Sequence, residues 1–377
     1  MKINPRHYIP IIALVVALTV TIIACSPKSS PTPSTTGTQD VAVKLVFTTQ
    51  PVGAEAGSVF ATLPMVAAED INGNVVTGSR ELVFLTITSG TGSSPPILFG
   101  GTTATSVNGI VNFKELSIDK AGSYTLTATS SGLTSAVSDP FDITPGAGVY
   151  LSFSTPIVGA SAGAAFMTQP VVTFLDIYGN TANSSTAEVS LSLIPNPYNL
   201  NPFAVLSGVK KVKAVNGVVD FKDLSIDKVG SYTLMAKIEG MTSVVSTPFE
   251  ITPGVAVKLV FSTQPAGGAA GSPLIINPPA IAVLVQDIYD NVVTSSTAEV
   301  SLTITPNTGA SRAVLSGVTK IKVEYGAADF EGLSIDKVGT GYTLTASSNG
   351  LISAVSDPFD ITPSPTPATP SSNVTTP

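Results

Sequence analysis

The sequence has 377 residues, of which 43% are hydrophobic and only 11% are charged, and its net charge is −7. An acidic chain of this kind predicts no nucleic-acid partner, because Lys and Arg must neutralise the phosphates in such complexes. The only His, His7, and the only Cys, Cys25, both lie near the N-terminus. The rest of the chain therefore lacks residues for His-dependent triads, Cys nucleophiles and most zinc sites.

The first 24 residues have the pattern of a secretory leader. Lys2 and Arg6 form a basic start, an apolar run covers residues 9–24, and an Ile-Ile-Ala tripeptide precedes Cys25. That tripeptide with its Cys resembles the lipobox of bacterial lipoproteins, in which the thiol is diacylated and the leader is cleaved before it. The resemblance implies lipidation at Cys25, the membrane as a partner, and a place in the cell envelope outside the cytoplasm. The alternative is an uncleaved anchor helix with an incidental cysteine.

Two flanks are rich in Ser, Pro and Thr. They follow the leader at residues 25–40 and end the chain at residues 364–377. Such segments cannot bury enough apolar surface to offset the entropy of the chain, so we expect a disordered spacer and tail.

Between the flanks, one module occurs three times. The copies open with similar apolar pentapeptides and close with the phrase Pro-Phe-Asp/Glu-Ile-Thr-Pro. Their period of about 107 residues is domain-sized, well above the 20 to 50 residues of a solenoid repeat. We therefore predict three domains, at residues 41–146, 147–254 and 255–363.

Within each copy, apolar positions alternate as they do in half-buried strands. Val83, Leu85 and Ile87 are one such run, and Asn-Gly pairs such as Asn108-Gly109 favour tight hairpins. About seven short strands in about 100 residues are typical of an immunoglobulin-like sandwich. The sequence thus predicts an all-β chain of three tandem immunoglobulin-like β-sandwich domains with disordered flanks.

A tyrosine marks the same place in each copy. In immunoglobulin folds a corner Tyr lies near the start of strand F, two residues before the second Cys. Tyr124, Tyr232 and Tyr342 take this tyrosine-corner position, and Leu126, Leu234 and Leu344 stand where the Cys would be. Aliphatic packing is therefore expected in place of a disulfide.

Several of these motifs resemble the bacterial immunoglobulin-like repeats of invasin and intimin. The turn at residues 70–76, the Asn-Gly segment at 107–113 and the Tyr segment at 121–128 carry the similarity in the first copy. The third copy departs from it, with Asp290 for the turn glycine and Tyr325-Gly326 for Asn-Gly. The resemblance covers residues 41–363 and implies an extended cell-surface rod that sometimes carries an adhesive tip.

Acidic residues recur at the repeat spacing. Asp70, Asp176 and Asp287 are interpreted as turn acids that cap backbone N–H groups, although a Ca²⁺ site or a glycosidase carboxylate pair would use the same residue type. A second acid precedes a Lys in each copy, as in Asp119-Lys120, and is read as a loop ion pair. We predict no catalytic residue, no metal, no cofactor and no enzyme activity.

Aromatic residues outside the tyrosine corner offer contact sites. Tyr178 and Tyr289 occupy the same turn in two copies, where packing over a strand end competes with stacking on a glycan. The loop of residues 195–203 is unique to the second copy, so Tyr198 and Phe203 are the candidate contact residues.

The prediction for function is a non-catalytic cell-surface lipoprotein that acts as a stalk, spacer or adhesin-type contact. The alternative is a carbohydrate- or protein-binding module that recruits a surface protein or glycan. The sequence leaves the oligomeric state open.

Overall fold

The computed structural model describes residues 41–93, 95–194, 203–274 and 280–364. Cys25, Tyr198 and both predicted flanks lie outside these ranges. The chain divides into two compact units, Met1–Val41 and Ala42–Pro377. Every regular element of the described residues is a β-strand, so within these ranges no helix has the length and hydrophobicity to cross a membrane.

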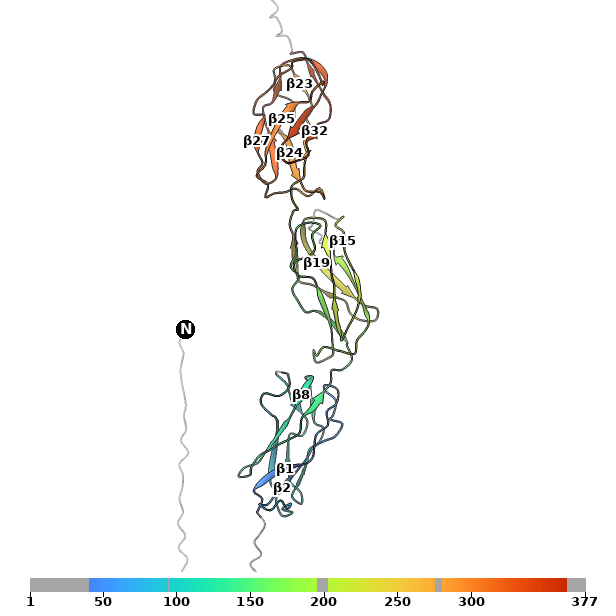
Figure 1. Cartoon of the computed structure of the whole chain (residues 1–377), viewed down its shortest axis with the longest axis vertical. Helices are drawn as coiled ribbons and strands as arrows, with labels where there is room; N and C mark the ends of the chain where they lie inside the picture. The colour runs from blue at the N-terminus through green and yellow to red at the C-terminus, as the bar shows by residue number, and fades with distance from the viewer. Residues whose placement is uncertain (1–40, 94, 195–202, 275–279, 365–377) are drawn as a thin grey trace, which may run out of the picture. The chain divides into compact units, whose positions relative to one another are not determined.

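The strands group by repeat copy, and each group is called a module below (Figure 1). The first module contains β1 (Lys44–Thr49), β2 (Met65–Glu69), β3 (Leu82–Ile87), β4 (Leu98–Phe99), β5 (Thr103–Thr105), β6 (Ile110–Asn112), β7 (Ser117–Ile118), β8 (Gly122–Tyr124), β9 (Leu126–Thr129), β10 (Ala136–Val137) and β11 (Phe141–Ile143).

The other two modules repeat this order. The second contains β12 (Tyr150–Phe153), β13 (Val171–Leu175), β14 (Glu188–Ile194), β15 (Leu206–Ser207), β16 (Lys211–Lys213), β17 (Val218–Asp220), β18 (Ser225–Ile226), β19 (Gly230–Lys237), β20 (Val244–Val245) and β21 (Phe249–Ile251). The third contains β22 (Lys258–Phe261), β23 (Gly268–Ala269), β24 (Ile281–Gln286), β25 (Glu299–Ile304), β26 (Leu315–Ser316), β27 (Lys320–Lys322), β28 (Ala327–Phe330), β29 (Ser334–Ile335), β30 (Gly339–Tyr342), β31 (Leu344–Ser347), β32 (Ala354–Val355) and β33 (Phe359–Thr362).

The two main sheets of each module are antiparallel and form a sandwich, and shorter strand pairings accompany them, including the parallel pair β23–β33 of the third module. In the first module the order is β1-β2-β6 in one sheet and β10-β9-β3-β5 in the other, and the other modules repeat both orders. Leu45 and Val66 of one sheet share a buried cluster with Val83 and Leu85 of the other, so the sheets face each other across one core. This is the immunoglobulin-like sandwich that the sequence predicts.

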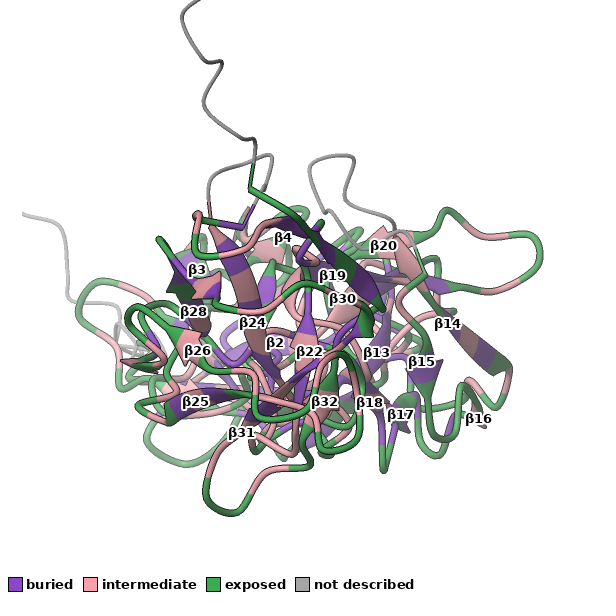
Figure 2. Cartoon of the chain, turned by 90° about the horizontal axis from the view of Figure 1, so that it is seen from above, coloured by how far each residue is buried: buried purple, intermediate pink, exposed green. Residues whose placement is uncertain are grey.

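The cores follow the repeats. Three buried hydrophobic clusters are found, and each draws its residues from a single module. Figure 2 shows buried positions mainly in the strands, where they alternate with less buried ones as along β14, and exposed positions mainly in the connecting loops. The period-two pattern of the sequence therefore places the core, while the exact domain boundaries remain a prediction.

The tyrosine corner ties the loop before strand F to the core. Tyr124 is fully buried, and its hydroxyl donates a hydrogen bond to the carbonyl of Lys120 at 2.9 Å. Its ring lies 6.4 Å from that of Phe141, its cross-strand partner on β11. The buried ring and this backbone anchor are the two contributions that a corner tyrosine makes in such folds.

The same corner recurs in the other modules. The hydroxyl of Tyr342 donates to the carbonyl of Lys337 at 2.8 Å, and that of Tyr232 donates to the carbonyl of Val229 at 3.4 Å. The leucines at the Cys positions are fully buried in all three modules: Leu126, Leu234 and Leu344.

Candidate functional site at the module junctions

An acidic turn follows β2, β13 and β24, one strand in each module. In the second module, the Asp176 carboxylate accepts hydrogen bonds from the backbone N–H groups of Tyr178 and Asn180, both at 2.9 Å. It also accepts from the Asn180 side-chain amide at 2.8 Å and from the Gly146 N–H at 3.0 Å. Four donors on one carboxylate confirm the turn-acid interpretation and leave little lone-pair capacity for a metal ion.

The third module builds the same turn. Asp287, which is fully buried, accepts from the N–H groups of Tyr289 at 2.8 Å and Asn291 at 2.9 Å. The Asn291 side-chain amide and the Gly254 N–H complete the set, both at 2.9 Å. The first module repeats the core of this turn around Asp70.

These contacts lower the pKa of the turn acids. Burial raises the pKa of Asp176 and Asp287, but hydrogen bonds from the Asn side chain, the backbone of the turn and the linker glycine outweigh it, so the net pKa lies below the ordinary value. The carboxylates are therefore charged at neutral pH and hold the turn in its folded shape.

The turn also bonds to the preceding module. The side-chain amide of Asn180 donates to the carbonyl of Asp119 at 2.9 Å, and its oxygen accepts from the N–H of Ala121 at 3.0 Å. The ammonium of Lys120 donates to the carbonyl of Tyr178. One turn of the second module thus makes three hydrogen bonds to the loop 119–121 that the tyrosine corner of the first module holds in place.

The junction between the second and third modules repeats these three bonds. The Asn291 amide donates to the carbonyl of Asp227 at 2.9 Å and its oxygen accepts from the N–H of Val229 at 3.1 Å. The ammonium of Lys228 donates to the carbonyl of Tyr289. Each Asn has the same two-sided role as in the first junction, because it binds its own turn acid and the neighbouring loop.

Each junction also has a tyrosine set against a glycine. A Cβ placed on Gly57 would lie 2.1 Å from the Tyr178 hydroxyl, and one on Gly163 would lie 2.2 Å from the Tyr289 ring. Both glycines have φ near +77°, where side chains other than hydrogen are strained. The glycines therefore provide the space in which the aromatic rings lie. We call the set of three hydrogen bonds and this Tyr–Gly contact the junction lock.

One expectation from the sequence is wrong here, and another gains a partner. Asp119 does not pair with Lys120, because its carboxylate accepts from the N–H of Ile97 at 2.8 Å while the ammonium reaches the next module. The packing interpretation of Tyr178 fits the structure, and the surface on which the ring packs belongs to the preceding module, because the ring lies against Gly57. Both partners are distant in sequence, so local pattern could not identify them.

The candidate contact loop is described only in part. Tyr198 lies outside the described residues, whereas Phe203 is 82% exposed. The residue that follows it, Ala204, helps to line a cleft of about 480 Å³ together with Leu191, Leu193 and Val205. The exposed ring and the apolar lining fit the predicted contact role and do not test it.

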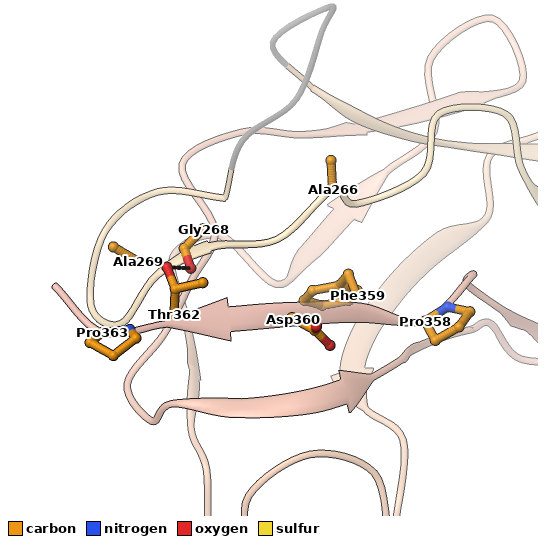
Figure 3. Close-up of a pocket in the computed structure, with 8 residues that line it drawn as sticks. All are labelled: Ala266, Gly268, Ala269, Pro358, Phe359, Asp360, Thr362 and Pro363. Atoms are coloured by element: carbon orange, nitrogen blue, oxygen red, sulfur yellow. Dashed lines mark hydrogen bonds between the residues drawn. The ribbon is translucent and has the colours of Figure 1, made fainter.

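A second cleft, of about 610 Å³, lies in the third module between residues 266–269 and 358–363 (Figure 3). Its lining is mostly Ala, Gly, Pro and Thr, and its one carboxylate, Asp360, accepts from the Gly341 N–H at 2.8 Å. No second acid or nucleophile stands opposite Asp360 in this lining. Over the part of the chain that is described, no group of three or more His, Cys, Asp or Glu could hold a metal ion.

The chain is similar to several solved structures. FdeC, an adhesin of Escherichia coli, matches at 16% identity and a TM-score of 0.38, over 86% of this chain and 98% of that one. The human desmocollin-1 ectodomain matches at 8% identity and a TM-score of 0.37, over 86% of this chain and 60% of that one. Extracellular domains 3–5 of Drosophila OTK match at 12% identity and a TM-score of 0.23, over 86% of this chain and all of that one.

No family model and no curated protein matches the sequence. The identities and TM-scores of the structural matches are too low to carry a conclusion about function. The immunoglobulin-like fold stands on the sheet order and the core described above.

One pattern in the sequence indicates the junction lock. Asn74, Asn180 and Asn291 occupy the same turn position in all three copies. A tyrosine two residues earlier occurs only in the second and third copies, which are the copies preceded by another module. A residue that appears only where a neighbour precedes it indicates a contact with that neighbour.

Proposed function

We propose that this chain is a non-catalytic lipoprotein of the cell envelope whose immunoglobulin-like modules form a spacer with defined joints. The observation that carries the proposal is the junction lock, which recurs with the same residue types at both junctions. Freely hinged modules have no need for three directed hydrogen bonds and a buried ring at each joint. A spacer that holds a contact surface away from the membrane does need them, because every loose joint shortens its mean reach.

The test is to break one joint without breaking the module. Gly57→Ala places a Cβ on the Tyr178 ring, whereas Gly271→Ala has a similar φ of +74° and meets no atom of the described residues within 4 Å. Both substitutions carry the same backbone strain, about 1–2 kcal/mol. Only the first should disturb a joint.

The measurement is single-molecule energy transfer between dyes on Thr103→Cys and Lys222→Cys, in a Cys25→Ser background. We expect one narrow distance distribution for the parent and for Gly271→Ala, and a broadened one for Gly57→Ala. A parent distribution as broad as that of Gly57→Ala would show that the joint is not held and would rule out a spacer with defined joints.

The anchor is tested separately. The Ile-Ile-Ala-Cys sequence supports acylation of Cys25, so Cys25→Ser should abolish incorporation of labelled palmitate and move the protein from the membrane to the soluble fraction. Incorporation that persists in the variant would contradict the lipoprotein assignment and leave the junction result untouched.

A second candidate function, recruitment of a surface protein or glycan, is favoured by one observation. Phe203 is exposed and directly precedes a residue of the apolar-lined cleft of the second module. An exposed ring next to a concave apolar surface is a common arrangement for sugar or protein contact. This role would share one end of the module with the second junction lock, because Val205, two residues after Phe203, donates its N–H to the Asp227 carboxylate at 2.7 Å and the carbonyl of Asp227 accepts from Asn291.

A further inference from the structure

The third module carries the same face that, in the first two modules, receives the turn of the next module. Gly271 occupies the place of Gly57 and Gly163, with a positive φ as in both. The N–H of each glycine donates at 2.8 Å to the carbonyl of the isoleucine that precedes the Asp-Lys loop: Ile118, Ile226 and Ile335. The glycine is therefore placed in the same way in all three modules.

The loop beside the glycine is also held in the same way. The Asp336 carboxylate accepts from the N–H of Val314 at 2.7 Å, as that of Asp227 accepts from Val205 at 2.7 Å. The Tyr342 hydroxyl fixes the carbonyl of Lys337. We call Gly271 with the loop 336–338 the socket of the third module.

The three modules differ in what lies over this glycine. A Cβ on Gly271 meets no atom of the described residues within 4 Å, in contrast to the rings that lie over Gly57 and Gly163. Val338 is 50% exposed, whereas Val229 at the same position is partly buried and donates its N–H to Asn291 of the next module. Lys337 donates to the carbonyl of Ser311 in its own module at 3.0 Å.

We propose that the socket of the third module is a docking site for the Asp-x-Tyr-x-Asn turn of a further immunoglobulin-like module. The two occupied sockets of this chain define the chemistry of the partner. A tyrosine ring would lie over Gly271, and the carbonyl of that tyrosine would accept from Lys337. An asparagine side chain would donate to the carbonyl of Asp336 and accept from the N–H of Val338. This proposal goes beyond the spacer role and does not depend on the lipid anchor.

A second copy of the chain lacks one part of this turn. The first module presents Asp70 and Asn74 in the same turn, and Asn74 is exposed there, but Asn72 stands where the other modules have tyrosine. Head-to-tail contacts that do not close into a ring produce open filaments. A tyrosine at this position would complete the turn and favour such head-to-tail association.

This difference supplies a gain-of-function test in the full chain, carrying Cys25→Ser to prevent acylation. Sedimentation velocity is measured over a concentration series up to about 1 mM. High concentrations are needed because a contact that is favoured within one chain by covalent linkage has a lower affinity between separate chains. We expect Asn72→Tyr to self-associate at least tenfold more tightly than the parent. Adding Gly271→Ala should reverse this gain, because the new Cβ would occupy the position of the ring. Adding Lys322→Ala, an exposed lysine on β27 outside the socket, should leave it unchanged.

A second measurement does not depend on affinity between chains. Residues 146–253 are appended after Pro363, so that the Asp176–Asn180 turn follows the socket at the spacing found in the chain. Amide exchange at Val338 should slow at least tenfold relative to the same fusion carrying Tyr178→Ala and Asn180→Ala in the appended copy. Equal exchange in the two fusions, or self-association of Asn72→Tyr that survives Gly271→Ala, would overturn the proposal.

Discussion

At the scale of single residues, the junctions depend on one side-chain amide each. Asn180 donates with one hydrogen to Asp176 in its own turn and with the other to Asp119 in the preceding module. Its oxygen accepts from Ala121, so every polar capacity that faces the junction has a partner. A carboxylate of the same length could not donate to Asp176 and Asp119, and this explains why a neutral amide occupies the position.

The turn acids should make stability depend on pH at the acidic end. Their folded pKa lies below the ordinary value of 3.8, so the unfolded chain binds protons more readily. Their contribution is fully present above the unfolded pKa and is lost as the pH falls through the folded pKa. We expect denaturant stability to be level from about pH 7 to pH 5 and to fall below about pH 4.

The matched variant is Asp176→Asn, which cannot titrate. We expect it to be less stable than the parent at pH 7, because an amide N–H₂ would then face the donor of Gly146 or Asn180. The difference from the parent should narrow as the pH falls to about 3. A constant difference across the titration would mean that the Asp176 charge is not what stabilises the turn.

At the scale of elements, the tyrosine corner connects the core to the junction. The Tyr124 ring is buried against β11, while its hydroxyl holds the carbonyl of Lys120 in the loop that binds the next module. The same residue therefore contributes to packing inside a module and to the position of the loop at its end. With no disulfide between the sheets, this packing has no covalent substitute.

Two substitutions at Tyr124 separate the contribution of its ring from that of its hydroxyl. Tyr124→Ala should cost about 3–5 kcal/mol in the unfolding of the first module, the range for large aromatic truncations in a core. Tyr124→Phe keeps the ring but removes two hydrogen bonds, one donated to the Lys120 carbonyl and a longer one accepted from the Ser93 N–H at 3.3 Å. It should cost about 0.5–1.5 kcal/mol for each. Chemical denaturation of the chain and both variants measures this. A loss for Tyr124→Phe equal to that of Tyr124→Ala would show that the hydroxyl, and not the buried ring, stabilises the corner.

At the scale of the whole molecule, the hydrophobic cores of the modules and the contacts between modules are made by different residues. Each of the three buried clusters is confined to one module, whereas the junction lock is polar apart from its tyrosine ring. A polar interface of this size adjusts the orientation of neighbours and adds little to their stability. We therefore expect the modules to fold separately and to be positioned by the lock.

A fragment of residues 147–254 tests this expectation. It should show a β-type circular dichroism spectrum and one cooperative thermal transition. Its midpoint should lie within a few degrees of the transition of the same module in the full chain, because it loses only junction contacts. A fragment that remains unfolded would mean that the core extends across a junction and that the predicted boundaries are misplaced.

Much of the fold could be predicted from sequence because its determinants are local and repeated. Alternation at Val83 and Leu85 predicted a strand with one buried face, and the Asn108-Gly109 pair, whose φ values are +52° and +76°, predicted a hairpin. Repetition at a fixed period marked the modules, and Tyr124 two residues before Leu126 indicated the corner of an immunoglobulin-like fold.

The candidate site could not be predicted in the same way, because its partners come together only after folding. Tyr178 and Gly57 are far apart in sequence, and no pattern in the residues around either one indicates that they are in contact. Lys120 stands next to an acid in sequence yet donates to a carbonyl of another module. Sequence periodicity determines which face of a strand is buried, since a strand has only two faces. The pairing of loops across a junction is decided by the tertiary structure, since it depends on where two folded modules present their ends.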